Sequence, residues 1–222
     1  MANIIIKATK APNLPISLVS YSQSYQEAFS NALRLYFNTL DAFTSNLSNV
    51  EGGSSLSFPH IGASDTTDQY ATASNTATIV RWNTLDSGLG FTLNPSNSAT
   101  AQHSGVYKID FSLQFANTDN AAHDVDMWLR INGVDLPGST SKVTIPARKS
   151  AGVFSYVLAV SFVMFTIDEG DDIELYWATN QAYSTTGPVD GVYMEYKPAQ
   201  TTPFAHPSIP SAIGTITFVS RT

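Results

Sequence analysis

The chain has 222 residues, of which 43% are hydrophobic and only 13% are charged. Its 18 acidic residues outnumber its 11 lysines and arginines, and a net charge of −7 would repel a phosphate backbone, so we expect no nucleic-acid partner. The absence of cysteine excludes disulfides, thiolate metal sites and a cysteine nucleophile.

No run of 18 apolar residues predicts a membrane crossing, and we expect no membrane partner. The first ten residues, MANIIIKATK, contain only three consecutive isoleucines, whereas a signal peptide needs a longer apolar run. The sequence therefore predicts a soluble protein that is made in a cytoplasm.

Residues 1–23 are predicted to form an extended N-terminal arm, because two prolines keep this segment out of helical conformations. A terminal arm of this kind is seldom ordered unless something holds it. We therefore expect it to attach to a partner protein or to a neighbouring copy. The candidate attachment residues are Ile4, Ile5, Ile6, Pro12, Leu14 and Pro15.

Residues 24–50 are predicted to form a helix, which opens with a possible capping box from Ser24 to Glu27. Six apolar residues are spaced by 4, 3, 4, 3 and 4 positions, which is a heptad seam. These seam residues are Phe29, Leu33, Tyr36, Leu40, Phe43 and Leu47. The seam favours a trimeric coiled coil, although an ordinary amphipathic helix lying on its own domain would show the same spacing. Residues 51–57, rich in glycine and serine, are predicted to be a linker.

From residue 58 to residue 222 the apolar period changes to two, which is typical of strands. In GVYKIDFSLQF, residues 105–115, every second residue is apolar, and residues 124–133 repeat the pattern before the turn signal Asn132-Gly133. Six further strands are expected within 76–82, 90–93, 152–167, 172–179, 189–196 and 211–221. So many short strands separated by turn residues predict a mainly β protein with an antiparallel jelly-roll sandwich.

One expected strand, FSYVLAVSFVMF at residues 154–165, is apolar on both of its faces. A strand at the surface of a two-layer sandwich needs a second cover if both faces are apolar. Either a loop or another subunit could supply that cover, and we favour another subunit. Four residues of this strand are assigned to the contact between copies: Val157, Ala159, Val163 and Phe165.

The order of GVYKIDFSLQF, MWLRING, a long apolar strand and DEGDDIELYW resembles the core of tumour-necrosis-factor and complement globular-head jelly rolls. The resemblance covers roughly residues 76–180 and implies a compact homotrimer. The N-terminal APNLPISLVSYSQSYQEAFSNALRLYFNTLD and the C-terminal PSIPSAIGTITFVSR are similar to segments at the ends of tailed-bacteriophage structural proteins. The chain departs from extracellular members of the jelly-roll group because it lacks cysteines, a signal peptide and a collagen-like repeat.

Residues with catalytic chemistry form no recognisable motif, so we expect neither an enzyme nor a cofactor. The four histidines are scattered through predicted loops without metal-ligand spacing. An acidic turn could offer oxygen ligands to Ca²⁺, but a solvated hairpin turn explains the same residues. The weak calcium candidates are Asp168, Glu169, Asp171 and Asp172.

These expectations combine into a virion structural protein, assembled in the host cytoplasm. In the leading interpretation, a homotrimeric decoration, or cement, protein attaches through its N-terminal arm to the major capsid protein or another virion protein and stabilises the head. In the alternative, the chain is the tip of a tail or head fibre that recognises a host receptor or glycan. Its contact surface would then include residues 179–189 and His123.

Overall fold

The computed structural model describes residues 12–14, 20–48, 58–186 and 189–221, except for the side chains of residues 46–48. The chain divides into two compact units, residues 1–57 and residues 58–222. The described part of the first unit consists mainly of the helix α1, Gln23–Ser48. Its N-cap is Ser22, whose hydroxyl accepts a hydrogen bond from the backbone N–H of Tyr25 at 3.4 Å. The helix begins before the predicted capping box, so Ser24 lies inside the helix, and the Glu27 carboxylate accepts a hydrogen bond from the Gln23 side chain.

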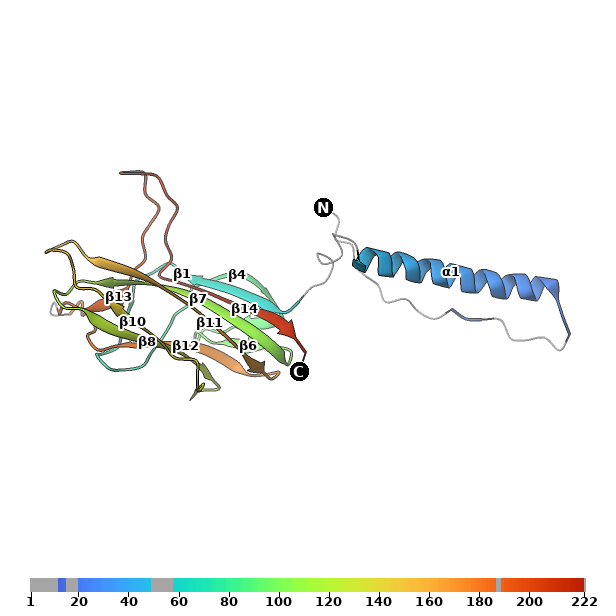
Figure 1. Ribbon diagram of the computed structural model, residues 1–222, viewed down its shortest axis with the longest axis horizontal. Helices are drawn as coiled ribbons and strands as arrows, with labels where there is room; N and C mark the ends of the chain where they lie inside the picture. Colours follow the sequence, from blue (N-terminus) through green and yellow to red (C-terminus); the bar gives the residue numbers. More distant parts are fainter. Residues whose placement is uncertain (1–11, 15–19, 49–57, 187–188, 222) are drawn as a thin grey trace. The chain divides into compact units, whose positions relative to one another are not determined.

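The second unit is a sandwich of two antiparallel sheets (Figure 1). Sheet A follows the order β2-β13-β7-β14-β1-β4, with β11 along the other side of β7. Its strands are β1 (His60–Asp65), β2 (Gln69–Tyr70), β4 (Thr84–Leu89), β7 (Gly105–Asn117), β11 (Ser155–Ile167), β13 (Val192–Met194) and β14 (Ala212–Ser220). This arrangement makes β11, β4 and the two-residue strand β2 the edge strands of sheet A.

Sheet B follows the order β10-β8-β12-β6-β5, with β3 beside β12 and β9 beside β8. Its strands are β3 (Thr78–Ile79), β5 (Phe91–Leu93), β6 (Ala99–Ala101), β8 (His123–Ile131), β9 (Val134–Asp135), β10 (Ser141–Ile145) and β12 (Asp172–Thr179). The β8–β9 hairpin turns at Asn132 and Gly133, which have φ values of 52° and 76°. Both residues adopt the positive φ that a two-residue hairpin turn requires, as the Asn-Gly signal predicts.

The core lies between the sheets and is built by strands whose side chains alternate between protein and solvent. On β7 the inward residues are Tyr107, Ile109, Phe111, Leu113 and Phe115, each at most 5% exposed. On β8 the inward residues Val125, Met127 and Leu129 are at most 2% exposed. The period of two in the sequence therefore corresponds to the buried faces of the two central strands.

Candidate functional site

Strand β11 carries an exposed apolar stripe on the face of sheet A that points away from sheet B. We call it the β11 stripe, and between 43% and 69% of each of its residues is exposed. The stripe consists of Tyr156, Leu158, Val160, Phe162 and Met164. Among the described residues β11 pairs with β7 alone, so its second edge offers unpaired backbone groups. A long, apolar and unpaired edge strand is a surface that favours association with another chain.

The four residues that the sequence analysis assigned to the contact between copies lie on the opposite, core-facing side of β11. Ala159 is 7% exposed and belongs to the core, and Val157, Val163 and Phe165 pack against that core half-buried. Pairing with β7 turns these four side chains toward sheet B rather than toward the outward face of sheet A, and their part in a contact between copies stays a prediction. A strand that is apolar on both sides gives no sequence signal as to which face is buried.

The β11 stripe is bordered by polar side chains of β7 on the same face of sheet A. Val160 is the register partner of Ser112, and Phe162 is the register partner of Asp110. Lys108 forms an ion pair of 2.7 Å with Asp110. A polar border beside an exposed apolar stripe resembles the rim and core of a protein interface.

Exposed apolar residues also occur on the edge strand β4 of sheet A and on β14. Leu85 and Leu89 on β4 are 54% and 43% exposed, and Ile213 on β14 is 41% exposed. Leu85 and Leu89 mark a second apolar area, on β4, which is separated from the β11 stripe by β7, β14 and β1. Ile213 belongs nearer the stripe, because its register partner Ser112 is also the register partner of Val160. Two unlike areas on one protomer suit a heterologous contact, in which one copy's first area covers the next copy's second area.

On α1 the predicted seam residues Phe29, Leu33, Tyr36, Leu40 and Phe43 are all intermediate in exposure. The side chain of Leu47, the sixth seam residue, lies outside the described ones. Leu35 and Phe37, off the seam, are 57% and 54% exposed. The helix therefore presents apolar surface on more than one side.

The predicted attachment residues fall largely outside the described part of the chain. Ile4, Ile5, Ile6 and Pro15 are not described. Pro12 and Leu14 lie in a short stretch without regular secondary structure, and Leu14 is 44% exposed. Their role in attachment stays a prediction.

The acidic turn between β11 and β12 does not assemble a calcium site. One Asp171 oxygen accepts a hydrogen bond from the Asp168 backbone N–H, and the other accepts one from the Asn132 side chain. The Asp172 carboxylate binds Thr100 and Asn94 instead. Within the described ranges, no three histidine or carboxylate side chains are grouped so that they could hold a metal ion. The candidate ligands act as hydrogen-bond acceptors that fix the turn, and Glu169 is exposed beside them.

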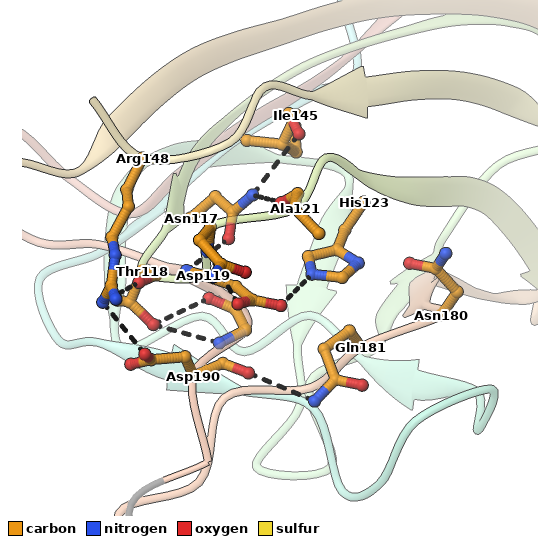
Figure 2. A network of polar contacts seen from close by, with 12 residues as sticks. Asn117, Thr118, Asp119, Ala121, His123, Ile145, Arg148, Asn180, Gln181 and Asp190 are labelled. Atoms are coloured by element: carbon orange, nitrogen blue, oxygen red, sulfur yellow. Dashed lines mark hydrogen bonds and ion pairs between the residues drawn. The ribbon is translucent and has the colours of Figure 1, made fainter. Parts of the chain in front are cut away.

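A polar network joins three loops at the end of the sandwich where β7 finishes (Figure 2). Asn117 is fully buried, and its side-chain amide donates to the carbonyls of Ala121, Ile145 and Pro146. Arg148 donates to the carbonyl of Thr118 at 2.7 Å. These bonds hold the loops that leave β7 and β10 against each other.

The remaining contacts of the network bring in the loop between β12 and β13. Arg148 Nη1 lies 2.9 Å from an oxygen of Asp190. Thr118 and Gly191 exchange hydrogen bonds through the backbone and the Thr118 hydroxyl. No periodicity in the sequence pairs these residues, which come from three separate loops.

His123, expected among the contact residues of the fibre alternative, is buried in this network instead. Its Nε2 lies 2.7 Å from Oδ2 of Asp119. The bond to His123, followed by a backbone N–H of Asn120, holds the pKa of Asp119 below its usual value. Of the loop expected beside it, the described Thr185, Thr186 and Val189 are exposed.

The network and the entry of the chain into the β unit lie at opposite ends of β7. Phe58, the first described residue of this unit, stacks on Phe218, which pairs with Tyr107 near the start of β7. The network lies at Asn117, the last residue of β7. At 3.3 Å per residue, the two ends of this strand are about 40 Å apart. Figure 1 shows the C-terminus at one end of the sandwich and β13 at the other.

In the described ranges, α1 included, the structure contains no helix with the length and apolarity that crossing a membrane requires.

No family model matches the chain, and no curated protein sequence matches it. Among solved structures, it is similar to Eiger TNF from S. frugiperda, with 13% identity and a TM-score of 0.45 over 74% of this chain and 94% of that one. It is also similar to the globular domain of zebrafish complement 1qA, with 11% identity and a TM-score of 0.43 over 75% of this chain and all of that one. At such identities the likeness concerns the fold alone. The predicted fold class, an antiparallel jelly-roll sandwich preceded by one helix, is confirmed.

Proposed function

We propose that the chain is a homotrimeric structural protein whose β units associate through the β11 stripe. The observation that carries the proposal is the exposure of five alternate apolar side chains along an edge strand that pairs on one side only. Burying such a stripe removes apolar surface from water and satisfies an open sheet edge.

A ring of three copies is favoured over a twofold dimer because the apolar areas on the edge strands β11 and β4 are unlike. An isologous dimer buries one area against itself, whereas a cyclic heterologous assembly uses both. The resemblance of the strand sequences to tumour-necrosis-factor and complement globular heads, which are compact trimers, favours three copies. The seam of α1 is compatible with a parallel bundle in the same assembly.

We further propose that the first unit, residues 1–57, attaches the trimer to a virion as a capsid decoration protein. The support is the resemblance of the two terminal segments to phage structural proteins. Three arms on a threefold site would act together, so that a modest affinity for each arm gives a tight bond by effective concentration. The trimer would then stabilise the assembled shell because it binds only that form.

A fibre tip is the second candidate, and the loop end of the sandwich favours it. The network around Asn117 and Arg148 holds three loops rigidly at the end farthest from where residues 1–57 join. Pre-ordered loops lose little entropy when they bind a partner. Mass spectrometry of purified particles that carry this chain separates the two roles, since decoration needs hundreds of copies and a fibre only a few trimers.

The test of self-association is the mass of the full chain in solution, with Phe162→Asp and Val134→Asp as matched variants. Phe162 and Val134 are each 69% exposed, but only Phe162 belongs to the β11 stripe. We expect wild type and Val134→Asp to be trimers and Phe162→Asp to dissociate. A monomeric wild type, or a Phe162→Asp variant that stays trimeric, overturns the proposal. The mass of a Leu40→Asp variant then shows whether α1 contributes to the contact between the copies.

A further inference from the structure

A hollow of about 320 Å³ lies on the outward face of sheet B, above β8, β10 and β12. Its floor is formed by Asp126 and Ala178, which are register partners on β8 and β12. The next pair along these strands is Trp128 and Tyr176. Their large side chains extend farther from the sheet than that of Ala178 does. The hollow therefore exists because one small residue, Ala178, lies beside a row of aromatic residues. Its size is at the lower end of ligand pockets, which span about 300–1,000 Å³.

The aromatic wall of the hollow is held in place before any ligand binds. Trp128 donates its indole N–H to Asp135 at 2.6 Å and stacks on Tyr176, with ring centroids 6.1 Å apart. The Arg130 guanidinium lies 3.9 Å from the Tyr176 ring centroid and pairs with the same Asp135. A ring fixed from two sides loses little freedom when a ligand stacks on it.

The polar wall of the hollow contains groups whose hydrogen-bonding capacity is not used by the protein. Asn180 Oδ1 accepts a hydrogen bond from the Asp124 backbone N–H, which fixes the orientation of the amide. Among the described residues, no hydrogen bond is made by Asn180 Nδ2 or by the Asp126 carboxylate, which lies 3.6 Å from the Lys142 ammonium. The hollow thus offers amide donors, carboxylate acceptors and one ammonium donor opposite an aromatic ring.

We propose that this hollow binds a neutral saccharide. A pyranose ring has one face of C–H groups, which stacks on an aromatic ring, and a rim of hydroxyls. Each hydroxyl both donates and accepts, so it can use Asn180 and Asp126 together. Two carboxylates, Asp124 and Asp126, against the single ammonium of Lys142 leave the hollow negative, which disfavours sialic acid, uronic acids and phosphate.

This inference deepens the fibre-tip candidate and is independent of the β11 stripe, which lies on the other sheet. The sugar-binding surface lies on the strand face of sheet B and adds to the ordered loops at its end as a second contact surface. A trimer built through sheet A would keep this face of every copy accessible. Failure of sugar binding and failure of trimer formation are thus separate results.

The experiment titrates the full chain with the methyl glycosides of glucose, galactose, mannose and N-acetylglucosamine, followed by saturation-transfer NMR and calorimetry. We expect at least one neutral glycoside to bind and N-acetylneuraminic acid not to bind. Ala178→Phe fills the hollow on the solvent face of a strand, where an aromatic residue is well tolerated. We expect it to abolish binding, and we expect Trp128→Ala to weaken binding at least about tenfold.

Thr92→Phe is the matched control, since it adds the same ring to an exposed position on β5, away from the hollow. It should bind as wild type does, and circular dichroism should show all variants folded. If Ala178→Phe does not fold, Asp126→Asn tests the polar wall without changing its shape. Absence of binding to every neutral glycoside, or binding that Ala178→Phe and Asp126→Asn leave intact, overturns the proposal.

Discussion

The ammonium group of Lys108 lies 5.4 Å from the ring centroid of Phe162 and 2.7 Å from a carboxylate oxygen of Asp110. Phe162 belongs to the β11 stripe, and Asp110 is its register partner on β7. A copy that covers Phe162 therefore also takes water away from this ion pair. A charge that loses water at a contact needs a partner of opposite sign, because burying an unpaired charge costs several kcal/mol of association free energy.

Lys108→Glu is expected to weaken self-association about tenfold or more, since it leaves two carboxylates side by side at the border of the stripe. The β unit should stay folded, because the side chains of Lys108 and Asp110 are 41% and 39% exposed. Sedimentation equilibrium of the full chain measures the effect. The exchanged pair Lys108→Glu with Asp110→Lys restores the match and should recover most of the association. A Lys108→Glu variant that associates like wild type would contradict this role of the pair.

Lowering the pH should destabilise the β unit because it protonates Asp119. The pKa of this residue is lowered mainly by its bond to His123. Arg148 nearby lowers it further. A carboxyl with a lowered folded pKa stabilises the fold fully above its ordinary pKa of about 3.9, and that stability is lost as the pH falls through the lower folded value. We expect Asp119→Asn to have a lower Tm than wild type at pH 7. The two Tm values should converge as the pH falls below about 4 and through the lowered folded pKa of Asp119.

Tryptophan fluorescence during thermal unfolding measures this, because Trp82, Trp128 and Trp177 all lie in the β unit. Asp86→Asn is the control, since Asp86 is an exposed carboxylate on β4. Its Tm should stay close to that of wild type at every pH. A difference in Tm between wild type and Asp119→Asn that stays constant from pH 7 to pH 2 would show that the Asp119 contact is not an electrostatic one.

The sequence predicts strands well where one face is buried, and less well where both faces are alike. On β7 the alternation from Tyr107 to Phe115 matches the buried face because the other face carries Lys108 and Asp110. On β11 both sets are apolar, so the pattern cannot tell which one faces the core, and pairing with β7 decides it. On β1 no pattern marks the strand, because Gly62, Ala63 and Ser64 are small and all buried.

The loop network and the hollow escape sequence reasoning for a different reason. Asp119, Arg148 and Asp190 are far apart in the chain and meet only because β7, β10 and β12 end at the same side of the sandwich. The hollow depends on Ala178 lying opposite Asp126 in register. Contacts of this kind follow from sheet pairing, which residue spacing along the chain does not encode.

Gly191 should be among the least replaceable residues of the loop end. A Cβ at this position would lie 2.6 Å from the Ala182 carbonyl carbon and 2.7 Å from the backbone of the neighbouring residues. Backbone atoms cannot turn away as a flexible side chain can, so the two segments would have to separate. That separation would also stretch the two-way hydrogen bonds between Gly191 and Thr118.

Gly191→Ala is therefore expected to destabilise the β unit by about 1–3 kcal/mol, the usual cost of overpacking. Gly88→Ala is the matched control, because a Cβ there meets only the side chains of Leu85 and Ile61, at ordinary distances of 3.5 Å and 3.9 Å. Its stability should change by less than about 0.5 kcal/mol. Urea unfolding of both variants, followed by tryptophan fluorescence, gives the two free energies. Equal stability of Gly191→Ala and Gly88→Ala would mean that the loops can move apart without cost and that the network does not hold this end of the sandwich rigid.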